Sequence, residues 1–237
     1  MAPRQAPATA RQGRGSTIAF SPALRELALG ARERVEAQLE RCELCGAAIA
    51  PQHRHVIDAS SGELKCTCRA CALLFDRDGA GGGHLRAVGS RRFALDGLSL
   101  DDARWAALGI PVEMAFFVRS SRDGHVRAIY PSPAGAMQAS LDTAAWWDEL
   151  VADNEPLKTI DDDVQALLVD RVRGRRRQWI VPIDDAYRLI TIVRTHWRGI
   201  TGGSALWREL DGFLDELDRS ARRILIHSDR EETRWPS

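Results

Sequence analysis

All five cysteines of this chain lie between positions 42 and 71 of its 237 residues, and this clustering constrains the fold more than any other feature. They read Cys42-x2-Cys45 and Cys66-x-Cys68-x2-Cys71. In a Cys-x2-Cys pair, a tight turn can direct both sulfurs at one ion, and four thiolates suit zinc or iron. The spacing therefore predicts one metal site whose ligands are Cys42, Cys45, Cys68 and Cys71.

The fifth thiol leaves alternatives for the ligand set open. A tetrahedral centre takes four ligands, so Cys66 could replace Cys68, or His53 or His55 could replace a cysteine. The loop between Cys45 and Cys68 has 22 residues, slightly more than the usual spacing of zinc ribbons. We expect His53 and His55 themselves to be exposed side chains on one face of a short strand.

The metal is expected to be zinc. Rubredoxins hold one iron between two similar knuckles, but they surround it with aromatic rings and carry glycine in both knuckles. Here only the first knuckle has its glycine, Gly46, and no aromatic residue lies between Cys42 and Cys71. Iron is the alternative, including an iron–sulfur cluster that would use Cys66. A zinc with four thiolates has no open position for a substrate, so the expected site is structural rather than catalytic.

Local composition divides the chain into segments. Ser21-Pro22 combines an N-cap with a first-turn proline and predicts a helix that runs into the first cysteine. The glycine-rich run Gly79–Gly83 predicts a flexible joint. The expected organisation is a disordered tail (1–16), a helix (17–41), a zinc-ribbon-like module (42–78), a linker (79–92), an α+β domain (93–223) and a tail (224–237).

The periodicity of apolar residues predicts the elements of both halves. In the module, two short strands flank a turn at Ser60-Ser61-Gly62. In the second half, two β-hairpins turn at Asp123-Gly124 and around Gly174, and Asp184 is expected to cap a helix. The expected elements are strands 53–58, 63–66, 112–119, 125–130, 166–172 and 178–183, and helices that begin near residues 102, 141, 184 and 204, the first opened by a capping box over 99–102. This mixture predicts an α+β fold with C-terminal helices.

Composition excludes several functional classes. No apolar run approaches the roughly 18 residues of a membrane span, and the first residues lack the apolar stretch of a secretory signal. Clustered cysteines without an export signal indicate a reducing compartment, so we expect a cytoplasmic protein. The net charge is zero, and the N-terminal part of the chain is mildly basic while the C-terminal part is mildly acidic. A general nucleic-acid-binding protein would usually be basic throughout.

One run of arginines could still contact an anion or a nucleic acid, although a solvated turn is the default for exposed charge at a hairpin tip. The run contains Arg171, Arg173, Arg175, Arg176 and Arg177. Elsewhere, no nucleophile, base and oxyanion donor occur at a recognisable spacing, so we expect the protein not to be an enzyme.

Several short motifs together carry a resemblance. They are Cys42-Glu-Leu-Cys45-Gly46, His53-Arg-His55, Cys66-Thr-Cys68-Arg-Ala-Cys71, Tyr130-Pro-Ser-Pro-Ala-Gly135, Val181-Pro-Ile-Asp184 and Trp197-Arg-Gly199. With these motifs, most of residues 40–220 resembles a family of unknown function encoded beside actinobacterial-type NiFe hydrogenase genes.

The resemblance implies a genomic setting rather than an activity. That setting suggests assembly, maturation or electron supply for a hydrogenase. We therefore expect a non-catalytic, zinc-binding accessory protein whose partner is a hydrogenase subunit or a maturation factor. The alternatives are a rubredoxin-like electron-transfer protein that uses iron and a zinc-ribbon protein that binds nucleic acid.

Overall fold

The computed structural model describes residues 40–76, 83–139 and 144–226. The expected tail over 1–16 and nearly all of the expected helix over 17–41 lie outside these residues. The described chain has an α+β architecture with two β-sheets, one of three strands and one of seven. The fold class expected from the sequence is therefore confirmed.

The cysteine module is built on the smaller sheet, whose strands run in the order β2-β1-β3 and are all antiparallel. The hairpin predicted around Ser60-Ser61-Gly62 is present, and Gly62 adopts the positive φ of 74° that its turn requires. The module's elements are β1 (Arg54–Asp58), β2 (Glu63–Thr67), α2 (Arg69–Leu74) and β3 (Leu85–Ala87).

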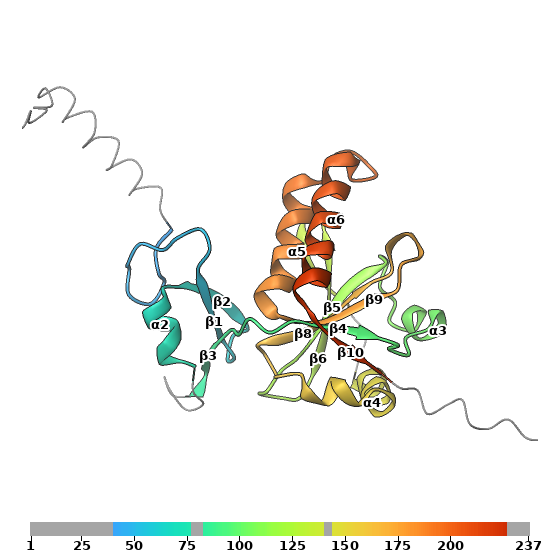
Figure 1. Cartoon of the computed structure of the whole chain (residues 1–237), viewed down its shortest axis with the longest axis horizontal. Helices are drawn as coiled ribbons and strands as arrows, with labels where there is room; N and C mark the ends of the chain where they lie inside the picture. Colours follow the sequence, from blue (N-terminus) through green and yellow to red (C-terminus); the bar gives the residue numbers. More distant parts are fainter. Residues whose placement is uncertain (1–39, 77–82, 140–143, 227–237) are drawn as a thin grey trace, which may run out of the picture. The chain divides into compact units, whose positions relative to one another are not determined.

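The larger sheet forms the second half of the chain and has the strand order β10-β4-β9-β8-β5-β6-β7 (Figure 1). Its neighbouring strands are antiparallel except β10 and β4, which are parallel. Its strands are β4 (Phe93–Asp96), β5 (Met114–Arg119), β6 (Val126–Ser132), β7 (Gly135–Gln138), β8 (Gln165–Asp170), β9 (Arg177–Pro182) and β10 (Arg222–Leu225).

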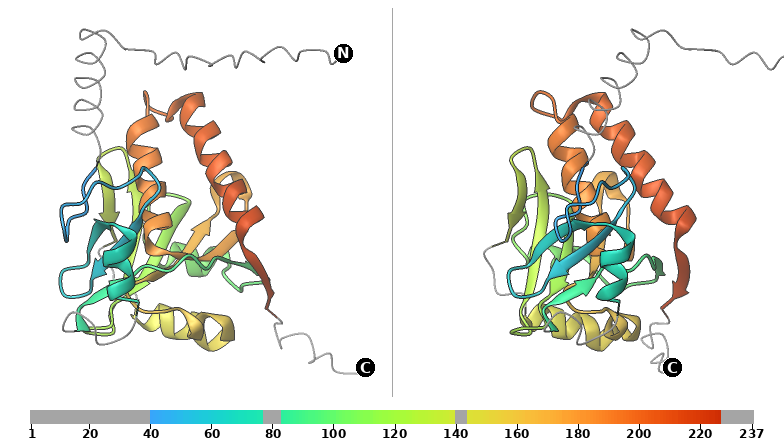
Figure 2. Two further views of the ribbon diagram at one scale, coloured as in Figure 1. Left: turned by 60° about the vertical axis from the view of Figure 1, so that its left-hand side comes forward. Right: turned by 90° about the vertical axis from the view of Figure 1, so that its left-hand side faces the viewer.

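Helices cover both faces of this sheet, and Figure 2 shows α5 and α6 on one side and α4 on the other. The helices are α3 (Asp102–Ala106), α4 (Ala144–Asp153), α5 (Ile183–His196) and α6 (Gly203–Ser220), with short 3-10 turns η2 (Glu155–Thr159) and η3 (Val172–Gly174). A strand alternates its side chains between the two faces. Accordingly, Phe116 packs in the core under α5 and α6, while Phe117 packs in the core under α3 and α4.

Two helix starts differ from the sequence expectation. The side chain of Asp101, not Ser99, caps α3, and it accepts a hydrogen bond of 2.8 Å from the backbone N–H of Arg104. Helix α5 begins one residue early, after Pro182, so Asp184 lies in its first turn and does not cap it. The carboxylate of Asp184 is thereby available for a contact outside the helix.

Strands β3, β4, β7 and β10 were not expected. Residues Leu85–Ala87, assigned to the linker over 79–92, form β3 because their backbone pairs with Val56–Asp58 of β1. Strand β10 runs into the segment expected to be the tail, and it pairs with β4 more than 120 residues earlier. The first two residues of the expected tail, 224 and 225, are therefore part of the large sheet, and residues 227–237 lie outside the described chain.

The module and the α+β domain share part of one core. Ile57 of β1 and Val88 after β3 belong to the same buried cluster as Phe116 and the apolar face of α5. Arg86 also donates a hydrogen bond of 2.5 Å to the backbone carbonyl of Asp162. These contacts fix β1, and the residues that it carries, against the start of α5.

None of the helices within residues 40–76, 83–139 and 144–226 is both long enough and apolar enough to span a membrane.

Candidate metal centre

The first knuckle is a tight turn held by backbone hydrogen bonds. The N–H of Gly46 donates to the carbonyl of Cys42 at 2.8 Å, and the N–H of Cys42 donates to the carbonyl of Ala47 at 2.8 Å. Gly46 has a φ of +75°, a conformation that side chains disfavour, which explains a glycine directly after the second cysteine. The turn leaves Cys42 buried and Cys45 exposed.

The second knuckle is the start of helix α2. Cys68 is the N-cap residue, and its sulfur accepts a hydrogen bond of 3.4 Å from the backbone N–H of Cys71. Because Cys71 lies in the first turn of the helix, its own sulfur points back toward the same place. The start of α2 therefore directs the sulfurs of Cys68 and Cys71 toward one point, as the turn at Gly46 does for Cys42 and Cys45.

The two knuckles bring four sulfurs together. The ligand atoms of Cys42, Cys45, Cys68 and Cys71 all lie within 4.8 Å of one another. A tetrahedral zinc with Zn–S bonds of about 2.3 Å separates its sulfurs by about 3.8 Å. The sulfurs of Cys45 and Cys68, one from each knuckle, are 3.8 Å apart. The donor set therefore fits one tetrahedral, thiolate-bound metal ion.

Proton affinities within this group are strongly uneven. Burial tends to raise the pKa of the Cys42 thiol, but hydrogen bonds from backbone groups of both knuckles outweigh it and lower the pKa to about 6. Hydrogen bonds with the Cys45 and Cys68 sulfurs raise the pKa of Cys71 to about 12. Sulfurs this close share protons among themselves, and a bound divalent cation would displace those protons and hold all four as thiolates.

Cys66 does not belong to this group of four sulfurs and lies beside the two histidines. His53, His55 and Cys66 place their ligand atoms within 4.8 Å of one another, and all three residues are half-buried. The expectation of exposed histidines was wrong, because the β1 side of the module packs toward α5. His55 Nδ1 is 2.9 Å from Asp184 Oδ2, a contact between residues 129 positions apart.

The signal for this second group was present in the sequence. The predicted hairpin about Ser60-Ser61-Gly62 sets a register in which His55 lies opposite Cys66, and the structure has this pairing. His53, two residues earlier, falls on the same face. Only the contribution of Asp184 depends on tertiary packing.

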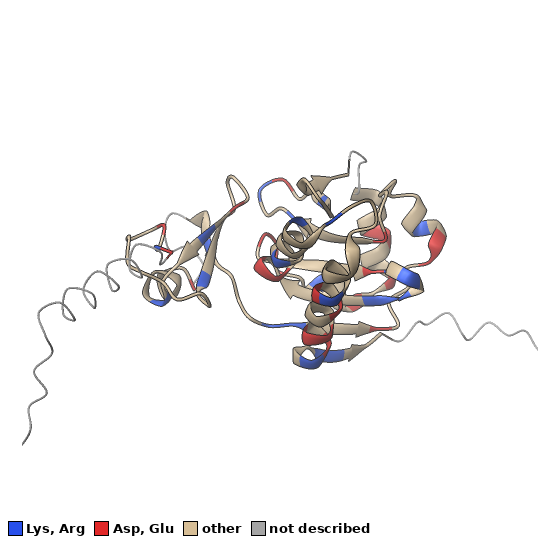
Figure 3. Cartoon of the chain, turned by 90° about the horizontal axis from the view of Figure 1, so that it is seen from above, with Lys and Arg blue, Asp and Glu red and all other residues tan. Residues whose placement is uncertain are grey.

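The arginine run lies at the turn between β8 and β9, as expected, and every one of its arginines has an acidic partner. Figure 3 shows basic and acidic segments interspersed in this domain. The pairs are Arg171 with Asp102 and Glu113, Arg173 with Asp211, Arg175 with Asp170 and Asp211, Arg176 with Asp102, and Arg177 with Asp170, Asp215 and Asp218. These ion pairs explain the arginine run as part of the domain's own fold, and they give no support to an anion-binding surface.

Comparison with known proteins gives one match. The model of DUF5947, described as a family of unknown function, matches residues 41–221, which include both knuckles, the histidines and the large sheet up to the end of α6. No curated protein and no solved structure matches the chain. Since the family model covers well over half of its length, the chain belongs to the family of unknown function DUF5947.

Proposed function

We propose that this protein is a non-catalytic accessory factor in which one zinc ion, held by Cys42, Cys45, Cys68 and Cys71, folds a module that contacts another protein. The observation that carries this proposal is the grouping of four sulfurs within 4.8 Å. Four protein thiolates fill a tetrahedral coordination sphere and leave no position for a substrate, which is typical of a structural metal.

Exposed apolar side chains beside the cysteines support a protein partner. Leu44 lies between the cysteines of the first knuckle, and Leu73 and Leu74 follow Cys71 in α2. Leu73 and Leu74 are 60% and 66% exposed, although α2 has only six residues. Apolar surface concentrated on so small an element is typical of a contact site for another protein.

The process and the partner are proposed from the resemblance described above. Its genomic setting favours a role in NiFe hydrogenase assembly or maturation, with a hydrogenase subunit or a maturation factor as the partner. Such a role would place the protein in the cytoplasm, where its thiols stay reduced.

Affinity purification of the tagged protein from its native host, followed by mass spectrometry, tests this proposal. We expect hydrogenase subunits or maturation factors to copurify with the wild-type chain. A Leu73→Asp/Leu74→Asp variant should lose them, whereas Ile200→Asp should keep them, because Ile200 is 96% exposed but lies in the α+β domain. Recovery of the protein alone, or equal recovery of the same partners with all three chains, would contradict the proposal.

A further inference from the structure

We infer that His53, His55 and Cys66 form a second metal site, which binds a late first-row divalent cation such as zinc and keeps a fourth position for an exchangeable ligand. The site would lie in the same module as the four-cysteine centre but share no ligand with it. This inference does not rest on the proposed function, because it concerns residues that the four-thiolate centre does not use.

The backbone brings the three side chains together. His55 and Cys66 are directly opposite each other on the antiparallel strands β1 and β2. Side chains in such positions start about 5 Å apart and leave the same face of the sheet. His53 precedes His55 by two residues, and the centroids of the two imidazole rings are 4.7 Å apart. All three ligand atoms then lie within 4.8 Å of one another.

Both histidines are held in a tautomer suited to metal binding. His53 Nδ1 is 2.9 Å from the backbone carbonyl oxygen of Ala50, and His55 Nδ1 is 2.9 Å from Asp184 Oδ2. Each of these oxygens can only accept, so each Nδ1 must carry the proton and donate it. In the neutral form of each ring, Nε2 is then the nitrogen whose lone pair can bind a metal, as in metal sites where a carbonyl or carboxylate orients the ligating histidine.

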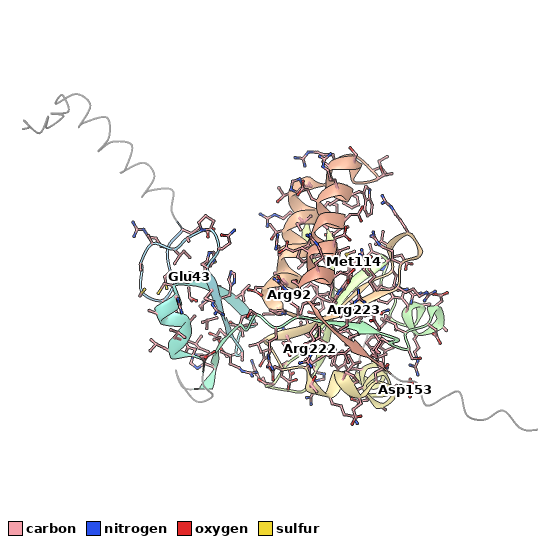
Figure 4. All side chains as sticks on the ribbon, in the orientation of Figure 1. Glu43, Arg92, Met114, Asp153, Arg222 and Arg223 are labelled. Atoms are coloured by element: carbon pink, nitrogen blue, oxygen red, sulfur yellow. The ribbon has the colours of Figure 1, made fainter. Side chains whose placement is uncertain are left out.

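Cys66 is positioned as firmly as the histidines. The backbone N–H of Cys66 donates to Glu43 Oε1 at 2.7 Å, and its carbonyl accepts from the N–H of Glu43 at 2.9 Å. Glu43, labelled in Figure 4, lies in the first knuckle, so the turn that presents Cys42 also fixes Cys66. The fifth cysteine is thus held next to the four-cysteine centre without being one of its ligands.

The chemistry of the three donors defines the ion. Two imidazoles and one thiolate suit borderline divalent cations such as zinc rather than calcium or magnesium, which prefer oxygen ligands. Two neutral histidines and one thiolate leave a net charge of about +1 on a bound divalent ion, and the carboxylate of Asp184 balances it. The side chains of His55 and Asp184 are 21% and 27% exposed, so the cluster is partly open to solvent, as a site with an exchangeable ligand would require.

Metal counting by equilibrium dialysis of the full-length, reduced chain against zinc tests the inference. We expect the wild-type chain to hold two zinc ions, and His55→Ala and Cys66→Ser each to hold one. The matched control is His125→Ala, which removes an exposed histidine of the α+β domain and should still hold two. One zinc in the wild-type chain, or two in His55→Ala, would overturn the inference.

Cobalt substitution separates this result from a misfolded module or a failed first site. The first equivalent of cobalt should show the absorption of a four-thiolate site in the wild-type chain and in both variants. The second equivalent should show a weaker thiolate band only in the wild type and in His125→Ala. Loss of a zinc by Cys66→Ser but not by His55→Ala would assign Cys66 to the first centre and overturn the second site.

Asp184 is predicted to be a positioning residue for this site. Asp184→Asn keeps an oxygen that can accept from His55 but removes the negative charge, and losses of such outer contacts typically weaken metal binding about 10–100-fold. We expect that loss for the second zinc alone, with the first zinc unchanged. An unchanged affinity for both ions would remove Asp184 from the site.

Discussion

The cysteine module and the α+β domain are stabilised in different ways, although they are parts of one chain. The domain buries two apolar clusters, one on each face of a seven-stranded sheet. The module buries few apolar side chains, and some of them, such as Ile57, belong to the domain's cluster. In place of a larger apolar core, the module has four cysteine sulfurs that lie within 4.8 Å of one another.

The comparison shows where a short segment can obtain its folding free energy. About 45 residues with three short strands and a helix of six residues bury too little apolar surface to fold on their own. A structural zinc contributes an apparent binding free energy of roughly 10–16 kcal/mol, which is more than the net stability of many whole domains. The domain instead has an apolar cluster on each face of its sheet.

Metal removal should produce the largest difference in stability between the module and the α+β domain. Chelation under reducing conditions should unfold the module, because it removes roughly 10–16 kcal/mol of apparent binding free energy, while the large sheet stays folded. Hydrogen exchange followed by mass spectrometry would report this as lost protection in β1 and β2 and kept protection in β5 and β8. Added zinc should restore the protection. Simultaneous exchange of both regions would contradict the comparison.

A cavity in the core of the α+β domain should destabilise the domain and leave the zinc content of the module unchanged. Phe117 is 0% exposed and lies in the core under α3 and α4, which contains no described residue of the module, so Phe117→Ala should lower the free energy of unfolding of the domain by about 3–5 kcal/mol. The control Leu74→Ala, at a position 66% exposed, should change it by less than about 0.5 kcal/mol. Urea denaturation measures both, and we expect an unchanged zinc content in Phe117→Ala, whereas a loss of zinc would contradict the comparison.

Two ion pairs of the α+β domain, one buried and one exposed, should differ in how much they contribute to its stability. Arg92 donates Nε and Nη2 to the two oxygens of the buried Asp185, at 2.6 and 2.8 Å. Arg92→Ala would leave that carboxylate buried without its cation and should cost about 3 kcal/mol. Arg223→Ala removes an exposed pair with Asp96 and should cost less than about 1 kcal/mol. Figure 4 labels both arginines, and equal losses in thermal or urea denaturation would contradict this account.

The smallest effect concerns the start of α3. Asp101→Ala removes the side-chain cap of this helix and should lower the free energy of unfolding by about 1 kcal/mol. Ser99→Ala, which alters the residue that the sequence pattern favoured as the cap, should have almost no effect. Urea denaturation of the two variants distinguishes them, and a larger loss for Ser99→Ala would contradict the capping seen in the structure.

Local patterns in the sequence were sufficient for three of the hairpins, β1–β2, β5–β6 and β8–β9, and for the four-cysteine group. The turn at Ser60-Ser61-Gly62 sets the register of β1 and β2, and the two Cys-x2-Cys pairs are each contained in one turn. Contacts between distant segments were not predictable in this way. Strand β10 is short and carries two arginines, so nothing local identifies it, and it forms only because β4 offers an open edge.

The candidate sites show the same division. The grouping of His55 with Cys66 follows from the hairpin register, whereas the expected exposure of each histidine taken by itself does not indicate it. The contact of His55 with Asp184 spans 129 positions and exists only because the module packs against the start of α5. Apart from Asp170 in β8, the acidic partners of the arginine run likewise come from α3, α6 and the loop before β5, which lie far from it in sequence.

The central claim is that four thiolates alone hold the ion that folds the module. X-ray absorption spectroscopy of the His55→Ala variant, purified from its native host with the metal that it acquires there, tests it most directly, because this variant leaves only the four-cysteine centre. Our account predicts zinc in protein purified from its native host, with four sulfur neighbours at about 2.3 Å and no lighter ligand. Iron in place of zinc, or nitrogen or oxygen in the first coordination shell, would contradict it.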